Sequence, residues 1–309
     1  MVPLTHMTAP KHVVSVGLGS SSRDARIETE LLGKPILIER KGSGGDLKKA
    51  AQMLRDLDGK VDAFGLGGTD LFIQAAGKRY YLRESLKLAK NAQVTPLVCG
   101  AGLKGTLERI VVRDLDKTLH WQDKRVLMLS AVDRFGMAET LAECGADVIY
   151  ADLIFILGLP VPLKSLKALA RLARVIAPAI VQLPVSVLYP TGSKQEKAEA
   201  GWRTKYFDWA EVIAGDFHFV KRYAPEDLSG KVVLTNTTTA EDVEMLRARG
   251  LKTLITTTPR YNGRSLSTNM LEAAFVALSG KFPLTDTDYR ELIERSGIKP
   301  DVLELNSQA

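Results

Sequence analysis

The 309-residue sequence predicts an α/β protein of two domains, an N-terminal βα sheet domain followed by a Rossmann-like doubly wound parallel sheet. Three observations favour this fold class. Short apolar runs, of the kind that parallel sheets bury, alternate with segments of helical composition. Many of these runs end in loops that are rich in glycine and polar residues. The length is also that of two domains of ordinary size.

We expect residues 1–122 to form the N-terminal domain, residues 123–284 the Rossmann-like domain and residues 285–309 a C-terminal helical tail. The strands predicted for the first domain are 13–17, 35–39, 61–64 and 96–99. The helices expected there are 25–32, 47–57, 84–91 and a further helix that ends near residue 112. Asp46 is the expected N-cap of the second of these helices.

Glycine-rich loops follow the predicted strands of the first domain. They are residues 17–24, 41–46, 65–70 and 100–106. In an open parallel sheet such loops line the ligand crevice, and glycine lets backbone N–H groups approach an oxygen-rich ligand. The loops therefore predict a binding face. An alternative stays open, in which the loops need glycine only for their geometry.

The second domain opens with a strand–loop–helix–strand unit that ends at Asp152. Its predicted elements are a strand at 126–129, a helix at 137–144 and a strand at 147–151. Apolar residues at helical spacing between 163 and 176 predict a helix that packs on the core or on a second copy of the chain, with a membrane-surface helix as the alternative. Further strands are expected at 210–214, 231–234 and 252–255, and further helices at 241–249, 269–278 and 287–296.

The loop of this opening unit departs from the dinucleotide fingerprint G-x-G-x-x-G. Ala131, Asp133 and Gly136 occupy the glycine positions. Gly136 still allows close helix–strand packing, and Ala131 is small enough for a tight turn. Asp133 would repel a pyrophosphate at the helix N-terminus, and Arg134 beside it is expected to compensate. The unit therefore predicts a dinucleotide site or, alternatively, a Rossmann-like unit that binds something else or nothing.

Asp152 follows the second strand of the unit, where a carboxylate bonds the adenosine ribose. An acid there favours NAD, with NADP as the alternative. Asn236 and Thr257 follow later strands, so they suit ribose, nicotinamide or polyol recognition, or else cap the next helices. The residues expected to bind the cofactor are Ser130, Ala131, Asp133, Arg134, Phe135, Gly136, Asp152, Asn236 and Thr257.

Asp70 and Lys104 are the candidates for acid–base chemistry. Each follows a predicted strand of the first domain, so their loops are expected to be neighbours. A lysine ammonium beside a carboxylate can exchange protons with a substrate hydroxyl while hydride leaves the same carbon. An ordinary salt bridge between the two residues is the alternative.

Composition limits the other functions. The net charge is +6, but Lys and Arg are spread along the chain, which favours a small anionic substrate over nucleic acid. No apolar run is long enough to span a bilayer, so no membrane insertion is expected. Two cysteines without C-x-x-C spacing and four scattered histidines predict no metal site. We expect a cytoplasmic protein, and a homodimer stays open.

Five segments stand out as motifs: VDAFGLGGTDLFI, GAGLKGTLER, LMLSAVDRFGMAETL, VIAGDFHFVKRYAPEDLSGKVVLTNT and LITTTPRYNGRSLSTNMLEA. They resemble a bacterial family usually labelled quinate 5-dehydrogenase, or predicted quinate/shikimate dehydrogenase. The resemblance covers nearly the whole chain, from about Val13 to Leu305. It implies a substrate domain followed by a Rossmann domain, and NAD(P)-linked oxidation of a cyclic polyol acid. Within the segments, Gly68-Thr69-Asp70 resembles part of the family's N-T-D motif, which carries over Asp70 alone.

Together these observations predict an NAD(P)-dependent dehydrogenase that oxidises the hydroxyl of a small polyol carboxylic acid resembling quinate or shikimate. Two alternatives stay open. One is a group-transfer enzyme that acts on a phosphorylated metabolite held by the glycine-rich loops. The other is a non-catalytic Rossmann-like sensor or assembly subunit, which the missing glycines and Asp133 favour.

Overall fold

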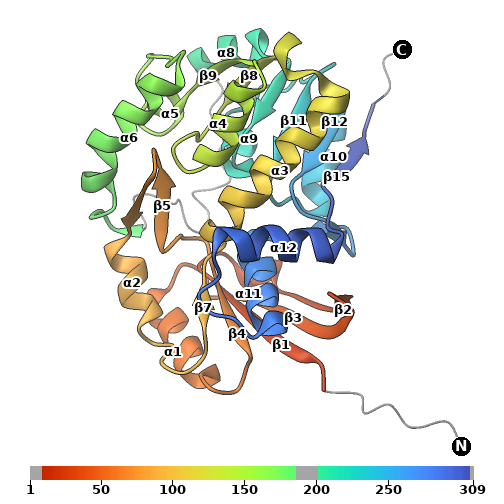
Figure 1. Cartoon of the computed structure of the whole chain (residues 1–309). Helices are drawn as coiled ribbons and strands as arrows, with labels where there is room; N and C mark the ends of the chain where they lie inside the picture. Colours follow the sequence, from red (N-terminus) through yellow and green to blue (C-terminus); the bar gives the residue numbers. More distant parts are fainter. Residues whose placement is uncertain (1–8, 186–200, 307–309) are drawn as a thin grey trace, which may run out of the picture.

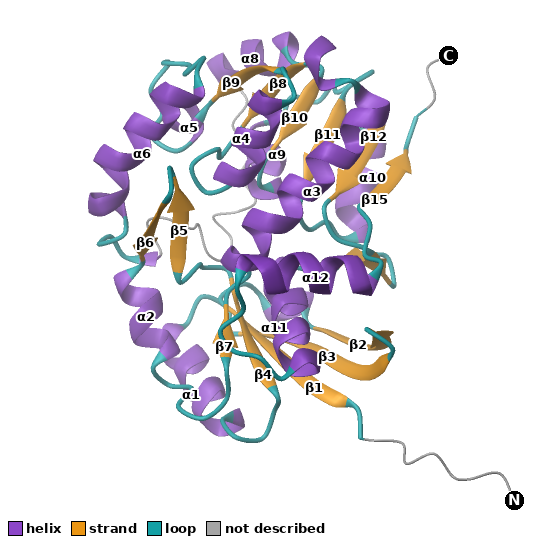
Figure 2. Cartoon of the chain, viewed as in Figure 1, coloured by secondary structure: helices purple, strands orange, loops and turns teal. Residues whose placement is uncertain are grey.

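Each of the two lobes of the protein is built around a mainly parallel β-sheet (Figures 1 and 2). The computed structural model describes residues 9–185 and 201–306. The predicted α/β class with parallel sheets is confirmed at this level.

The N-terminal sheet has the strand order β2-β3-β1-β4-β7. Its strands are β1 (Lys11–Gly17), β2 (Ala25–Leu31), β3 (Lys34–Gly42), β4 (Ala63–Gly67) and β7 (Leu97–Val98). All run parallel except β2, which is antiparallel to β3. The chain leaves β1 first toward β3 and later toward β4, so a topological switch point lies at the carboxyl end of β1.

The C-terminal sheet repeats this arrangement with the order β15-β12-β11-β10-β8-β9. Its strands are β8 (Arg125–Met128), β9 (Asp147–Tyr150), β10 (Val212–Ala214), β11 (Val232–Thr235), β12 (Thr253–Thr256) and β15 (Asp301–Glu304). Only β15, at the edge, is antiparallel to its neighbour. A second switch point lies between β8 and β10. Two small hairpins complete the strands: β5 (Phe72–Ala75) with β6 (Lys78–Tyr81), and β13 (Arg260–Tyr261) with β14 (Arg264–Ser265).

The helix predicted at 25–32 is wrong, because this segment is strand β2. Its burial alternates, with Ile27 and Leu31 buried and the charged residues between them exposed. Ile27 pairs with Ile38 of β3 in the hairpin. A period of two residues is the signal of a strand with one buried face, and here it outweighs helical composition.

The helices cover the sheets and connect the lobes. They are α1 (Leu47–Leu57), α2 (Arg83–Ala89), α3 (Ala101–Leu119), α4 (Phe135–Glu143), α5 (Asp152–Phe155), α6 (Leu166–Ile180), α8 (Thr204–Trp209), α9 (Phe217–Tyr223), α10 (Ala240–Ala248), α11 (Thr268–Ser279) and α12 (Asp286–Ser296). Helix α3 runs past the predicted end near 112 and stops where His120 adopts a left-handed conformation with φ of 52°.

Helix α11 returns the chain from the second lobe to the first. Figure 1 shows it against the N-terminal sheet, and it packs on β1 and β4. Gly65 of β4 permits this contact, because a Cβ atom there would lie 2.8 Å from the backbone oxygen of Asn269. The chain then rejoins the C-terminal sheet through β15. The two lobes are thus tied together by several passages of the chain.

Candidate functional site

A cavity of about 860 Å³ opens between the two lobes. Segments that follow β1, β4 and β7 line it from the N-terminal lobe, and segments that follow β8, β9, β10 and β11 line it from the other lobe. The carboxyl ends of both parallel sheets therefore meet at one cleft. Open α/β sheets bind their ligands at this edge.

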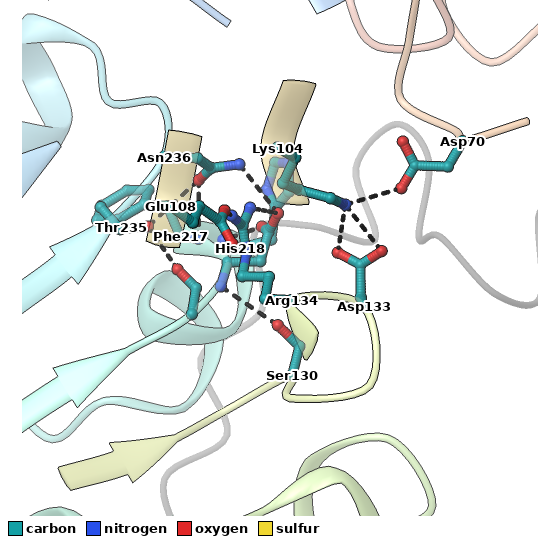
Figure 3. A network of polar contacts seen from close by, with 12 residues as sticks. Asp70, Lys104, Glu108, Ser130, Asp133, Arg134, Phe217, His218, Thr235 and Asn236 are labelled. Carbon is teal, nitrogen blue, oxygen red and sulfur yellow. Dashed lines mark hydrogen bonds and ion pairs between the residues drawn. The ribbon is translucent and has the colours of Figure 1, made fainter. Parts of the chain in front are cut away.

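Lys104 bridges the lobes at this cleft (Figure 3). Its Nζ donates to Oδ2 of Asp70, after β4, at 3.1 Å and to Oδ1 of Asp133, after β8, at 3.0 Å. Burial disfavours the ammonium, but the two carboxylates outweigh it and raise the pKa of Lys104. Burial raises the pKa of Asp70 to about 7. Burial acts in the same direction on Asp133, but the charges of Lys104 and Arg134 outweigh it and lower the pKa of Asp133.

Arg134 joins a second buried network (Figure 3). Its guanidinium forms an ion pair with Glu108 of α3, and its Nη2 lies 3.3 Å from Oδ2 of Asp216, after β10. Asn236, after β11, donates from Nδ2 to the same oxygen at 3.1 Å. Burial opposes ionisation of Asp216, but the charges of His218 and Arg134 outweigh it and lower the pKa of Asp216 to about 2. The network fixes the loops after β8, β10 and β11 to one another.

The carboxylate of Asp152 contacts the protein backbone and does not stand free to bind a ribose, contrary to the sequence prediction. It is buried, and its carboxylate accepts hydrogen bonds from the backbone N–H groups of Ala131 at 3.1 Å and Val132 at 2.9 Å. Burial raises its pKa to about 7, although these two hydrogen bonds oppose the rise. The donors that a pyrophosphate would use in this loop are already satisfied by a carboxylate.

The structure separates the predicted site residues into two groups. Those that line the cavity are Asp70, Lys104, Ser130, Asp133, Arg134, Asp152 and Asn236. Those outside the lining are Ala131, Phe135, Gly136 and Thr257. Phe135 packs in the hydrophobic core, and Thr257 is fully buried. Gly136 packs on helix α3, not on a strand as predicted, because a Cβ atom there would lie 2.8 Å from the Gly105 backbone oxygen.

Two glycines of the loops in the N-terminal lobe are required by geometry. Gly100 has a φ of 91°, which side-chain-bearing residues rarely adopt, and a Cβ atom there would lie 2.7 Å from the backbone nitrogen of Asn269. A Cβ atom on Gly42 would lie 2.6 Å from the backbone oxygen of Ser20. These positions agree with the alternative in which packing, more than backbone contact with a ligand, explains the glycines.

Sequence reasoning missed an arginine cluster in the cleft, formed by Arg23, Arg40 and Arg264. Nη1 of Arg40 donates to Oδ1 of Asp24 at 2.8 Å and to the Ser20 backbone oxygen at 3.0 Å. Arg264 donates to the backbone oxygen of Arg23. Burial, and then the charges of Arg23 and Arg264, lower the pKa of Arg40 to about 10. The arginines come from distant parts of the chain, so no local motif could reveal them.

In the part of the chain that the structure describes, no group of three or more His, Cys, Asp and Glu side chains is placed to hold a metal ion. None of the helices in the same ranges combines the length and apolar character that a membrane crossing needs.

Comparison with known families places two matches on the chain. Residues 102–305 match the family described as "Domain of unknown function (DUF8754)". Residues 12–99 match the one described as "Domain of unknown function (DUF8753)". No curated protein matches the sequence.

Solved structures that match the chain include proteins named for sugar binding or transport. A galactofuranose binding protein has 12% identity and a TM-score of 0.34, with 93% of this chain and 99% of that chain covered. A periplasmic solute binding protein from Actinobacillus succinogenes 130z with bound D-allose has 10% identity and a TM-score of 0.39, with coverages of 96% and 98%. A ribose transporter protein from Conexibacter woesei has 10% identity and a TM-score of 0.37, with coverages of 94% and 98%.

The predicted NAD(P)-dependent dehydrogenase is corrected by the geometry of the loop after β8. This geometry opposes a nicotinamide cofactor, because Asp152 takes the N–H groups of Ala131 and Val132 and Asp133 adds a carboxylate at the same turn. Arg134 does not offset Asp133 for a diphosphate, since it is bound to Glu108 and Asp216. The predicted cytoplasmic location is withdrawn.

Proposed function

Since the chain belongs to the family described as "Domain of unknown function (DUF8754)", whose description names no activity, we propose a function from the cleft. The protein binds a small polyhydroxylated molecule between its lobes and does not transform it. One observation carries the proposal: the carboxyl ends of two parallel sheets open onto a single cavity of about 860 Å³. This volume lies within the range of about 300–1,000 Å³ that is usual for small-molecule sites.

The chemistry of the lining suits a ligand with many hydroxyl groups. Short polar side chains reach the cavity from both lobes, among them Ser20, Ser22, Asn236, Thr237 and Asn269. Hydroxyls and amides both donate and accept hydrogen bonds, as sugar hydroxyls do. An aliphatic part of the lining comes from the segment between β9 and α6 and from α6 itself. Its side chains include Leu153, Ile156, Leu157, Leu172 and Ile176.

The arrangement of Lys104 favours binding over proton transfer. Two carboxylates hold its ammonium and raise its pKa, so the group stays charged at neutral pH. A general base needs a pKa near the working pH and a free lone pair. Lys104 therefore serves to hold the two lobes in register.

A cleft-blocking variant tests the proposal. Thr237 is half-buried and lines the cavity, so Thr237→Trp would place an indole in the cleft. Thr287→Trp is the matched control, because Thr287 is exposed on α12 and outside the cavity lining. A thermal-shift panel of sugars, polyols, sugar acids and sugar phosphates identifies ligands of the unmodified protein.

We expect at least one member of the panel to bind with one molecule per chain. Thr237→Trp should weaken its affinity by about tenfold or more, while Thr287→Trp leaves it unchanged. Failure of every compound to bind, or equal binding to both variants, would contradict the proposal. X-ray scattering with the bound compound should also show a smaller radius of gyration if the lobes close on it.

The predicted homodimer stays a proposal. The segment between α5 and α6 and its surroundings expose Ile156, Leu157, Leu159, Val161 and Val175. Exposed apolar side chains of this kind suit a contact between copies of a chain. Light scattering after gel filtration should give twice the chain mass of 33.8 kDa, and a value equal to that mass would contradict the dimer.

A further inference from the structure

Helix α6 forms one side of the cleft and runs between the lobes (Figure 1). Shortly before the helix, Leu163 exchanges backbone hydrogen bonds of 2.8 and 3.1 Å with Tyr150 of β9, which ties it to the C-terminal lobe. At the other end, the backbone oxygen of Val181 accepts a hydrogen bond of 3.1 Å from the N–H of Arg83, the first residue of α2 in the N-terminal lobe. The helix is therefore anchored at both ends beside the cavity.

Two rows of apolar side chains, each with a spacing of four residues, run along α6. The first row is buried and turns toward the interior of the protein. It consists of Leu169, Ala173 and Ala177. The second row, called the aliphatic row below, is half-buried and lines the cavity over a length of about 12 Å. It consists of Leu172, Ile176 and Ile180.

The structure describes α6 over its whole length, and the side of this helix that faces the cavity carries no charge. Each side chain that it contributes to the lining is a leucine, an isoleucine or an alanine. Its charged residues, Lys167, Arg171 and Arg174, are exposed and lie outside the lining. Ile156 and Leu157 also line the cavity and are 45% and 46% exposed, so the aliphatic lining reaches the opening of the cleft.

A ligand that consists only of hydroxylated carbons does not match this side of the cavity. A hydroxyl group pressed against an aliphatic surface loses its hydrogen bonds to water and gains no partner, which opposes binding. A methylene group at the same place leaves water and favours binding. The cavity of about 860 Å³ lies near the upper end of the range for drug-sized ligands, so it has room for both kinds of group.

We propose that the ligand of the cleft is a polyol that carries an aliphatic group, and that this group packs on the aliphatic row of α6. The inference rests on the proposed function and narrows its ligand class from polyols in general to amphiphilic polyols. The hydroxylated part binds the short polar side chains of the lining. The aliphatic part leaves water on contact with Leu172, Ile176 and Ile180.

Calorimetric titration with two series of probes tests the inference. The first series is methyl, butyl, hexyl and octyl β-D-glucopyranoside, and the second is butan-1-ol, hexan-1-ol and octan-1-ol, all below the concentrations at which they form micelles. Affinity should rise with chain length in both series, by about threefold to fourfold for each methylene group that is buried.

Two variants of adjacent residues locate the binding of the alkyl chain. Ile176→Asn places an amide in the aliphatic row, and it should weaken the binding of the octyl compounds about tenfold. Val175→Asn is the matched control, because Val175 is 77% exposed on the same helix and lies outside the cavity lining. The control should leave these affinities unchanged. Circular dichroism of both variants excludes unfolding as the cause of lost binding.

The outcomes separate this inference from the proposed function. Affinity of the unmodified protein that does not rise with chain length overturns the inference without any variant. Equal affinity for the octyl compounds in Ile176→Asn and Val175→Asn also overturns it, since the chain then binds elsewhere on the surface. A sugar that loses affinity in Thr237→Trp would leave the proposed function standing after either failure.

Discussion

Replacement of Lys104 by Met removes the cation that bridges the two lobes. The ammonium lies 3.1 Å from Asp70 and 3.0 Å from Asp133, and its side chain is only 10% exposed. At an effective dielectric constant of about 20, each contact of this length is worth roughly 5 kcal/mol of Coulomb attraction. Desolvation of the ammonium offsets much of this energy, and loss of one member of a buried ion pair usually costs about 3–5 kcal/mol.

We therefore expect Lys104→Met to lower the free energy of unfolding by about 3–5 kcal/mol near neutral pH. Urea unfolding followed by circular dichroism measures this difference. Lys117→Met is the matched control on the same helix, because Lys117 pairs with Asp114 but its side chain is 77% exposed. The control should change stability by less than about 1 kcal/mol. A loss for Lys104→Met no larger than that of the control would refute the bridging role of Lys104.

Two further predictions concern titration and packing. The pKa of Asp70 is raised to about 7, chiefly by burial, so the folded protein holds a proton that the unfolded chain releases near pH 4. This contribution to stability is complete below that pH and is lost as the pH rises through about 7, with a slope of up to about 1.4 kcal/mol per pH unit. Asp70→Asn should flatten the slope measured by urea unfolding across this window, and an unchanged slope would contradict the assignment. Gly136→Ala should destabilise the protein by about 1–3 kcal/mol, because its Cβ atom would meet the Gly105 backbone oxygen at 2.8 Å. A Cβ atom at Gly105 meets nothing within 4 Å, so Gly105→Ala should instead stabilise helix α3 by about 0.5–1 kcal/mol. Urea unfolding of the two variants measures both changes in stability. A Gly105→Ala variant less stable than Gly136→Ala would contradict this packing.

The sequence predicted the sheets better than it predicted the contacts between them. Apolar runs identified most parallel strands, because strands buried on both faces must be continuously apolar. The segment 25–31 was missed because its composition suits a helix, while its alternation of buried and exposed residues suits a strand. The return of α11 to the first lobe could not be seen at all, since no local pattern reveals which sheet a helix covers.

The site residues also divide into contacts that local sequence predicts and contacts that only the folded chain creates. Asp70 and Lys104 were expected to be neighbours because both follow strands of one sheet, and their atoms lie 3.1 Å apart. The addition of Asp133 to this pair, from the other lobe, depends on how the lobes meet. Arg264 and Arg23 are 241 residues apart in the sequence yet share a hydrogen bond. Spacing rules cannot find such contacts, because they arise only when the whole chain has folded.

The most direct test of the account is a crystal structure of the protein with the compound that the thermal-shift panel identifies. We expect density for one molecule in the cleft between the lobes, in contact with Ser20 or Ser22 on one side and with Asn236 or Thr237 on the other. Density elsewhere, or contacts with one lobe alone, would contradict the claim that both sheets build a single binding site.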